Sequence, residues 1–165
     1  MRYCIKPATS VDVAFLAAVV DDNRDPWNAA DALPIERLLQ TCASSAQIWA
    51  ARDAKGTPTA LWGVAPVSDD PQVGQLWMLA CEIFDNDPET LQELSRLVFG
   101  EMLDEFPRLE NLVDSRKVRA LELLRAIGFA IEPAVPQPSP DIDLCRVWID
   151  SDRLHRGGRA GRLPN

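Results

Sequence analysis

The chain has 165 residues, of which 47% are hydrophobic and 25% are charged, and its formal net charge is -8. This length and balance are typical of one globular domain with its own core, and they argue against a disordered or fibrous chain. No apolar run approaches the roughly 18 residues of a membrane-spanning helix, the N-terminal segment lacks the layout of a signal peptide, and an acidic body is a poor match for nucleic acid.

The first quarter of the chain predicts a strand, two helices and a loop. Residues 3–7 have the pattern of a strand ended by Pro7, after which Thr9 or Ser10 can cap a helix. Acidic residues and a proline interrupt the pattern over 21–33, and Pro34 begins a short helix. The apolar residues expected along the first helix are Val11, Phe15, Ala18 and Val19.

Three strands are expected next. Residues 47–53 and 59–67 are apolar, and the Gly and Pro of the segment between them are typical of a hairpin connection. Residues 73–84 form a long, nearly continuous apolar run, which predicts a central strand buried on both faces. The cysteines in predicted strands, Cys4, Cys81 and Cys145, are expected to be buried thiols.

The second half of the chain alternates helices with strands. Asp87 followed by Pro88 is a strong helix start, and that helix should end before Pro107. Residues 109–113 predict a strand parallel to 73–84, reached through this helix. Ser115 is predicted to cap a further helix that stops at Gly128, before strands at 129–135 and 144–149. The mixed order predicts one sheet with helices on its faces.

The C-terminal segment differs from the rest in charge. Four of the 17 basic residues lie after residue 152 with no acid among them, which leaves 13 basic and 25 acidic residues before that point. We therefore divide the chain into a domain of residues 1–150 and a basic Gly/Arg-rich tail, 151–165, that is flexible unless it docks on another surface. The arginines of the tail are Arg153, Arg156, Arg159 and Arg162.

A resemblance to a known family emerges from these motifs. The order of elements is similar to the GNAT (GCN5-related N-acetyltransferase) fold, and residues 2–12 and 119–132 look like its opening and its late helix. A narrower match resembles the GNAT-like family of short-tailed bacteriophages described as internal virion protein A or as an acetyltransferase. The positions that carry this match are Trp77, Ala80, Pro107, Leu109, Asn111, Val113, Leu124, Gly128 and Phe129.

This resemblance implies an α+β fold over residues 1–150, with a mixed, mostly antiparallel sheet and helices on both faces. It also implies a glycine-rich loop before the long helix, whose main-chain N–H groups hold the cofactor's pyrophosphate. The corresponding residues 85–90 contain no glycine, no basic residue and three acids. Asp87 as a cap would occupy those N–H groups, and Pro88 removes one of them.

The family's frequent general acid, a tyrosine in the late helix, falls on Leu124, which cannot donate a proton. We therefore assign no catalytic residue and no cofactor, and expect a noncatalytic protein of a phage particle or its assembly. The alternative is an active N-acetyltransferase that binds acetyl-CoA through Leu79, Cys81, Asn86 and Thr90. A host-directed inhibitor or other binding module also stays open. One histidine and scattered cysteines predict no metal site.

Two groups of residues are candidates for interaction. Trp27 stands in an acidic loop, where it can anchor a partner or pack over the sheet edge. The arginines of the tail, from Arg153 to Arg162, can bind an acidic protein or nucleic acid. The expected partners are other phage structural proteins or a second copy of this chain, and the expected location is the virion or the host cytoplasm.

Overall fold

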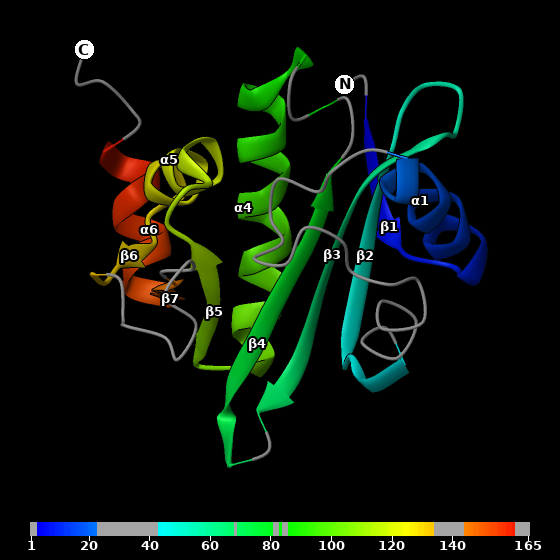
Figure 1. Cartoon of the computed structure of the whole chain (residues 1–165). Helices are drawn as coiled ribbons and strands as arrows, with labels where there is room; N and C mark the ends of the chain where they lie inside the picture. The colour runs from blue at the N-terminus through cyan, green and yellow to red at the C-terminus, as the bar shows by residue number, and fades with distance from the viewer. Residues whose placement is uncertain are drawn as a thin grey trace.

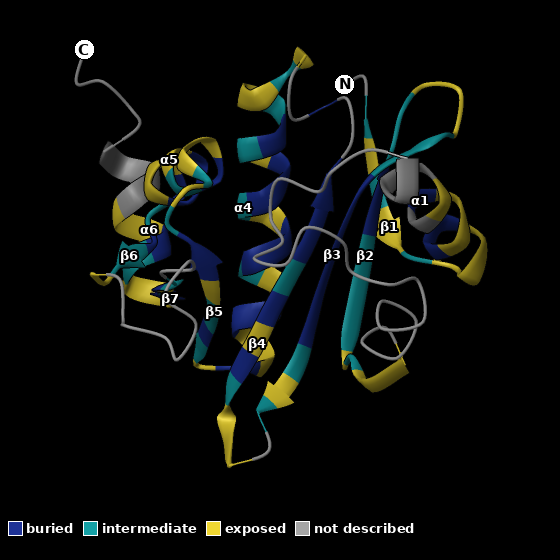
Figure 2. Ribbon diagram, in the orientation of Figure 1, coloured by how far each residue is buried: buried dark blue, intermediate teal, exposed yellow. Residues whose placement is uncertain are grey.

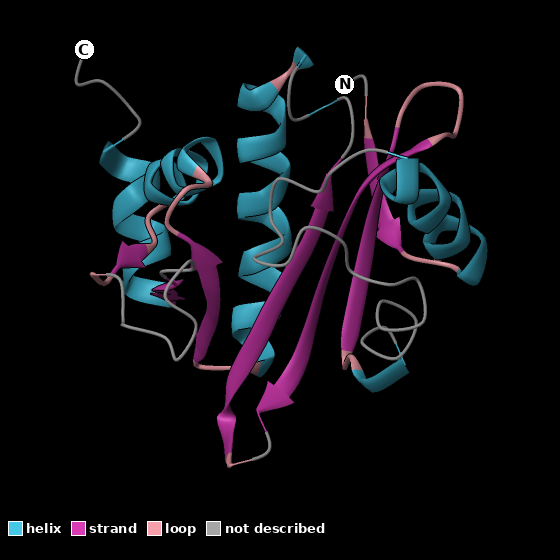
Figure 3. Ribbon diagram, in the orientation of Figure 1, coloured by secondary structure: helices cyan, strands magenta, loops and turns pink. Residues whose placement is uncertain are grey.

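The computed structural model describes residues 3–22, 43–67, 69–80, 83, 86–133 and 144–160. Their strands form one seven-stranded sheet in the order β1-β2-β3-β4-β5-β7-β6 (Figures 1 and 3). All neighbouring strands are antiparallel except β4 and β5, which are parallel as predicted. The strands are β1 Cys4–Pro7, β2 Gln47–Arg52, β3 Pro58–Val67, β4 Asp70–Ala80, β5 Arg108–Asp114, β6 Ala130–Ile131 and β7 Leu144–Asp150.

Helices cover both faces of this sheet. Helix α1 (Ser10–Asp22) lies over one face beside β3, while α4 (Pro88–Glu105), α5 (Val118–Ile127) and α6 (Ser151–Ala160) pack together on the other (Figure 1). This arrangement confirms the predicted α+β architecture with a mostly antiparallel sheet and helices on both faces. None of the described helices is long and apolar enough to cross a membrane.

Two apolar clusters hold the layers together (Figure 2). The larger one lies between the sheet and α4, α5 and α6, and contains the fully buried Trp62 and Phe99. The indole N–H of Trp62 donates to the hydroxyl of buried Ser95 at 3.0 Å, so the polar atoms at its centre are satisfied. The smaller cluster lies under α1 and consists of Val13, Leu16, Ala50, Leu61 and Leu79.

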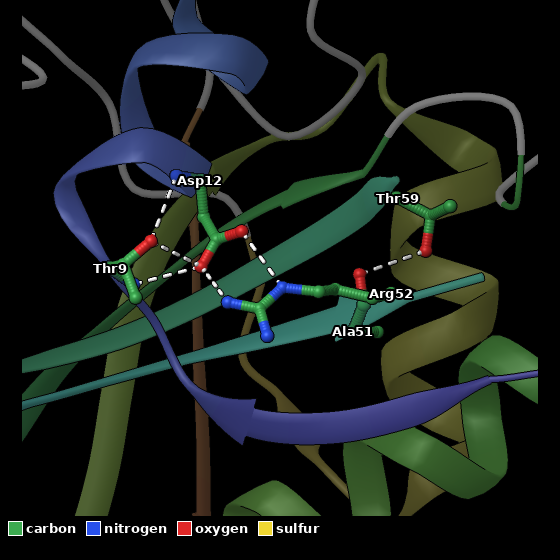
Figure 4. A network of polar contacts seen from close by, with 5 residues as sticks. All are labelled: Thr9, Asp12, Ala51, Arg52 and Thr59. Carbon is green, nitrogen blue, oxygen red and sulfur yellow. Dashed lines mark hydrogen bonds and ion pairs between the residues drawn. The ribbon is translucent and has the colours of Figure 1, made fainter. Parts of the chain in front are cut away.

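An ion pair sets which side of α1 faces the sheet (Figure 4). Thr9 caps the helix reciprocally: its main-chain N–H donates to Asp12 at 2.8 Å, and its hydroxyl accepts from the N–H of Asp12 at 3.3 Å. The Asp12 carboxylate, 3% exposed, also accepts two bonds from Arg52 of β2, at 3.0 and 2.5 Å. The Arg52 guanidinium holds the pKa of Asp12 below its usual value.

This contact explains why the apolar residues that predicted α1 are not those that it buries. With Asp12 turned towards β2, its neighbours Val13 and Leu16 are buried. Val11 is 74% exposed and Phe15 43% exposed, because they lie on the opposite side of the helix. The partner that fixes this orientation is 40 residues away in sequence.

Several predicted boundaries are corrected by the structure. Strand β4 begins at Asp70 and ends at Ala80, and Ile83 is helical, so 73–84 is not one strand. Among the described residues 129–133 of the predicted strand 129–135, β6 covers Ala130–Ile131, and the N–H of Glu132 donates to the carbonyl of Arg146 at 2.9 Å. Ser115 does not cap α5, whose cap position is Lys117 with no side-chain bond. The reason is that the preceding turn is held by Asp114, whose carboxylate accepts from the N–H of Arg116 at 2.9 Å.

The C-terminal segment was expected to be flexible unless it docks on another surface, and its described residues dock on the domain itself. Ser151–Ala160 is helix α6, and Leu154 is 7% exposed within the larger cluster. Arg96 of α4 donates to the carbonyl of Leu154 at 2.5 Å and to that of Ile127 at 2.7 Å. Burial lowers the pKa of this guanidinium. The packed unit therefore continues past residue 150.

The two cysteines in the described residues differ in burial. Cys145 is buried as predicted, whereas Cys4 is exposed because β1 is an edge strand. Cys81 lies outside the described residues. In the part of the chain that the structure describes, no group of three or more His, Cys, Asp or Glu side chains could hold a metal ion.

Candidate functional site

The parallel strands β4 and β5 separate soon after they meet (Figure 1). They pair only over residues 73–75 of β4 and 108–110 of β5. Beyond these positions β4 stays paired with β3 up to Ala80, and β5 stays paired with β7 up to Asp114. The inner edges of the two strands therefore face each other without pairing over residues 76–80 of β4 and 111–114 of β5. We call this region the splay.

The side chains around the splay are mainly apolar. A small hollow lies there, lined by Leu76, Trp77, Met78, Phe99, Asn111, Val113, Leu124 and Val147. The space open to a water molecule is about 10 Å³, hardly enough for one water. Leu124, the position that matches the family's tyrosine, thus lines the hollow, where it can pack but cannot transfer a proton.

Helix α4 begins with a cap made by its own residues. The carboxylate of Asp87 accepts from the main-chain N–H of Thr90 at 3.3 Å, and Pro88 occupies the first turn. Glu89 adds a second acid in that turn and is exposed. A helix N-terminus attracts anions because its first N–H groups are free and its dipole is positive there. Here an internal carboxylate already uses that position.

The splay and the N-terminus of α4 therefore differ in how well they suit a cofactor. The splay offers main-chain groups to an extended ligand, but the helix end opposes a phosphate, since Asp87 takes an N–H, Pro88 lacks one and Glu89 adds negative charge. A pyrophosphate does not fit the described residues at this helix end.

Three of the four residues predicted to bind acyl-CoA lie in the described part of the chain. Leu79 is 3% exposed and packs in the cluster under α1. Asn86 is exposed, and Thr90 is half-buried with its N–H already bonded to Asp87. Cys81 lies outside the described residues.

The predicted interaction residues fall into two groups. Trp27, Arg162 and the side chain of Arg159 lie outside the described part of the chain. Arg153 is half-buried and donates to the carbonyl of Gly128 at 3.0 Å, so it holds α6 to the end of α5. Arg156 is exposed, with a bond of 3.4 Å to the carbonyl of Asp152.

Sequence reasoning missed a cluster around Trp148 on β7. The guanidinium of Arg108 lies 4.3 Å from the centre of the Trp148 ring, and that of Arg153 lies 5.2 Å from it. Arg108 also pairs with Glu110 at 3.1 Å. These arginines come from different elements, so no local spacing could have indicated the cluster.

Comparison with solved structures bears on the fold as a whole. An N-acetyltransferase from Staphylococcus aureus Mu50 matches with a TM-score of 0.69 and 14% identity over 91% of this chain and 98% of that one. The ribosomal-protein-S5-alanine acetyltransferase from Vibrio fischeri matches with a TM-score of 0.70 and 14% identity, over 93% and 96% of the two chains. The chain has the GNAT fold.

A spermidine N-acetyltransferase from Vibrio cholerae, solved with CoA and spermine, is also similar, with a TM-score of 0.66 and 12% identity over 93% of this chain and 98% of that one. At identities this low the likeness shows a shared fold and says nothing about a shared activity. No protein-family model matches the chain. No curated protein matches it either.

Proposed function

We propose that this chain is a noncatalytic GNAT-fold protein that acts through protein contacts, in a phage particle or during its assembly. The observation that carries the proposal is the capped N-terminus of α4. In an acyl-CoA enzyme of this fold that position receives the pyrophosphate, whereas here the carboxylate of Asp87 accepts from Thr90. Asp87 takes one N–H group there, Pro88 lacks another and Glu89 adds negative charge, so all three residues disfavour an anion at this helix end.

The position of Leu124 supports the same proposal. It is 1% exposed and lines the hollow between β4 and β5, at the place where the family resemblance puts a proton donor. A leucine contributes packing there and nothing to acid–base chemistry. The described residues therefore lack both the phosphate site and the general acid that the resemblance implies.

The assignment to a phage particle rests on the sequence resemblance alone. Its residues run in order from Trp77 to Phe129, and Trp77, Asn111, Val113 and Leu124 all line the hollow. On this proposal these residues shape the splay for contact with a partner rather than for acetyl transfer.

A second candidate is an active N-acetyltransferase with an unusual cofactor pose. The observation in its favour is the splay itself, because the unpaired inner edge of β4 over 76–80 could hydrogen-bond the amide groups of an acyl-CoA arm. In that pose the phosphates would have to avoid the N-terminus of α4.

Thermal unfolding with and without acetyl-CoA distinguishes the candidates. A ligand at 100 times its Kd stabilises a protein by about 2.7 kcal/mol, which raises Tm by roughly 5–10 °C at this chain length. The noncatalytic protein shows no shift in 1 mM acetyl-CoA, and a shift of that size would favour the enzyme. Mass spectrometry of purified particles of the encoding phage tests the location, and absence of the chain from particles and assembly intermediates contradicts it.

A further inference from the structure

Two arginines and a tryptophan share the side of the sheet that faces away from α4. Val147 and Ile149 of β7 belong to the larger cluster on the α4 side, so the alternate residues Arg146 and Trp148 point the other way. The same alternation places Arg108 of β5 on this side. Arg146 is exposed, and the other two are half-buried. We call Arg108, Arg146 and Trp148 the Trp148 face.

Two guanidiniums lie against the indole of Trp148 with most of their N–H groups unused. That of Arg108 is 4.3 Å from the ring centre and that of Arg153 is 5.2 Å from it, contacts that hold a guanidinium in place. Arg108 donates through Nε to Glu110, and Arg153 donates through Nε to the carbonyl of Gly128. Within the described ranges, their Nη atoms and the indole N–H bond no other protein group. Such donors suit carboxylates, which an arginine can bind through two N–H groups at once.

The surroundings of the Trp148 face are positive, although the chain is acidic. Three arginines lie on or beside it, and the carboxylates there are those of Glu110 and Asp150. Both carboxylates have partners, since Glu110 pairs with Arg108 at 3.1 Å and Asp150 accepts from the main-chain N–H of Arg153 at 2.8 Å. Because the whole chain carries a net charge of -8, a second copy brings the acidic surface that this face complements.

Helix α4 presents such an acidic surface. Its buried residues face the sheet, and exposed positions recur along its outer side (Figure 2). Glu93, Leu97 and Glu101 follow one another there at intervals of four residues, and Leu97 is 59% exposed. Glu89 and Glu105 extend the row, which we call the acidic ridge. Among the residues that the structure describes, neither Glu93 nor Glu101 has an ion pair, so nothing offsets the charge of the ridge there.

The spacing of the acidic ridge matches that of the Trp148 face. Leu97 lies about 6 Å along the helix from the glutamate on either side of it. Along β7, Arg146 lies about 7 Å before Trp148. Arg108 pairs with Asp150 and so lies about 7 Å beyond Trp148 on the neighbouring strand. Each surface therefore has an apolar side chain midway between two charges, and the charges of the two surfaces are opposite in sign.

We infer that the acidic ridge of one copy of this chain docks on the Trp148 face of a second copy. Leu97 then packs against the indole of Trp148, and the glutamates beside it face Arg108 and Arg146. The two surfaces lie on opposite sides of the sheet, so the contact is heterologous and repeats into a row or a ring of copies. This inference goes beyond the proposed function and does not depend on it, because neither surface contains the cap of α4 or the splay.

Sedimentation equilibrium of the full chain tests the inference. At about 50 mM NaCl we expect the average mass to rise above that of one chain as the concentration approaches about 1 mM, and at about 0.5 M NaCl we expect association to weaken at least tenfold. A single chain at every concentration overturns the inference. Association that strengthens with salt also overturns it, because the contact would then not be ionic.

Three variants locate the contact. The ridge variant is Glu93→Lys with Glu101→Lys, and its control, Asp69→Lys with Glu122→Lys, makes the same change in charge at other exposed positions. The face variant is Arg108→Gln with Arg146→Gln. We expect the ridge and face variants each to associate at least about tenfold more weakly than the control. Equal association of the ridge variant and its control overturns the inference, and this comparison decides if the face variant fails to fold.

Mixing the two variants separates this contact from a general effect of charge. The face variant keeps its acidic ridge and the ridge variant keeps its Trp148 face, so the mixture should form complexes of two chains and no larger assembly. A mixture that associates no better than its components overturns the inference. That failure would leave the proposed function intact, since the proposed function fails only if acetyl-CoA binds.

Discussion

Removing the side chain of Leu154 tests whether α6 belongs to the folded domain. Leu154 is 7% exposed, belongs to the larger cluster, and lies against Gly100 of α4. Leu→Ala substitutions in cores cost about 2–5 kcal/mol. Helix α6 is the last described element. If the substitution cost more than the docking of α6 contributes, α6 would undock instead, so the free energy of docking is an upper limit on the cost. We therefore expect Leu154→Ala to lower the unfolding free energy by about 2–3 kcal/mol.

Urea unfolding followed by tryptophan fluorescence measures this change. A chain truncated after residue 150 should lose at least as much, because Arg96 and the carbonyl of Gly128 then lose their partners on α6. Arg156→Ala is the matched control, since its side chain is exposed, and a surface change of this kind costs less than about 0.5 kcal/mol. The packing account of α6 is refuted if the unfolding free energies of Leu154→Ala and of the truncated chain both lie within about 0.5 kcal/mol of the unmodified value, as expected for a surface change.

Other substitutions probe the remaining contacts. Asp12→Asn should lower the unfolding free energy at pH 6. Because the pKa of Asp12 is lowered in the folded state, the difference in unfolding free energy from the unmodified chain should shrink as pH falls below about 4, where the unfolded carboxyl is protonated. A constant difference in urea unfolding from pH 6 to 2.5 would contradict the role of the ion pair. Asp87→Ala should cost about 1 kcal/mol by loss of the α4 cap, measured in the same way, and a neutral or stabilising result would contradict that cap. Gly63→Ala should cost about 1–3 kcal/mol and shift tryptophan emission, because the new methyl group would overlap the ring of Trp77; unchanged emission would contradict this close approach.

Features decided by neighbouring residues could be predicted from the sequence. The start of α4 is set locally, by Asp87 as the cap and Pro88 in the first turn. Likewise, Gly128 ends α5 with a positive φ of 126°. The parallel pairing of β4 with β5 followed from the helix that connects them. These predictions held because capping and crossover connections depend on local or topological rules.

Features decided across the fold could not be predicted in this way. The orientation of α1 depends on Arg52, which is distant in sequence from Asp12. Helix α6 includes Gly157 and Gly158, both poor helix formers, and is held by Arg96 of α4. The hollow combines side chains of β4, α4, β5, α5 and β7, so only the assembled fold reveals it.

Direct calorimetric titration with acetyl-CoA tests the central claim that the capped N-terminus of α4 excludes the cofactor's phosphates. The unmodified chain should give no heat of binding up to millimolar ligand, at low salt, where attraction of an anion would be strongest. Micromolar binding, lost when the adenosine diphosphate part of the ligand is removed, would contradict the claim, because the helix end would then be holding the phosphates despite Asp87, Pro88 and Glu89.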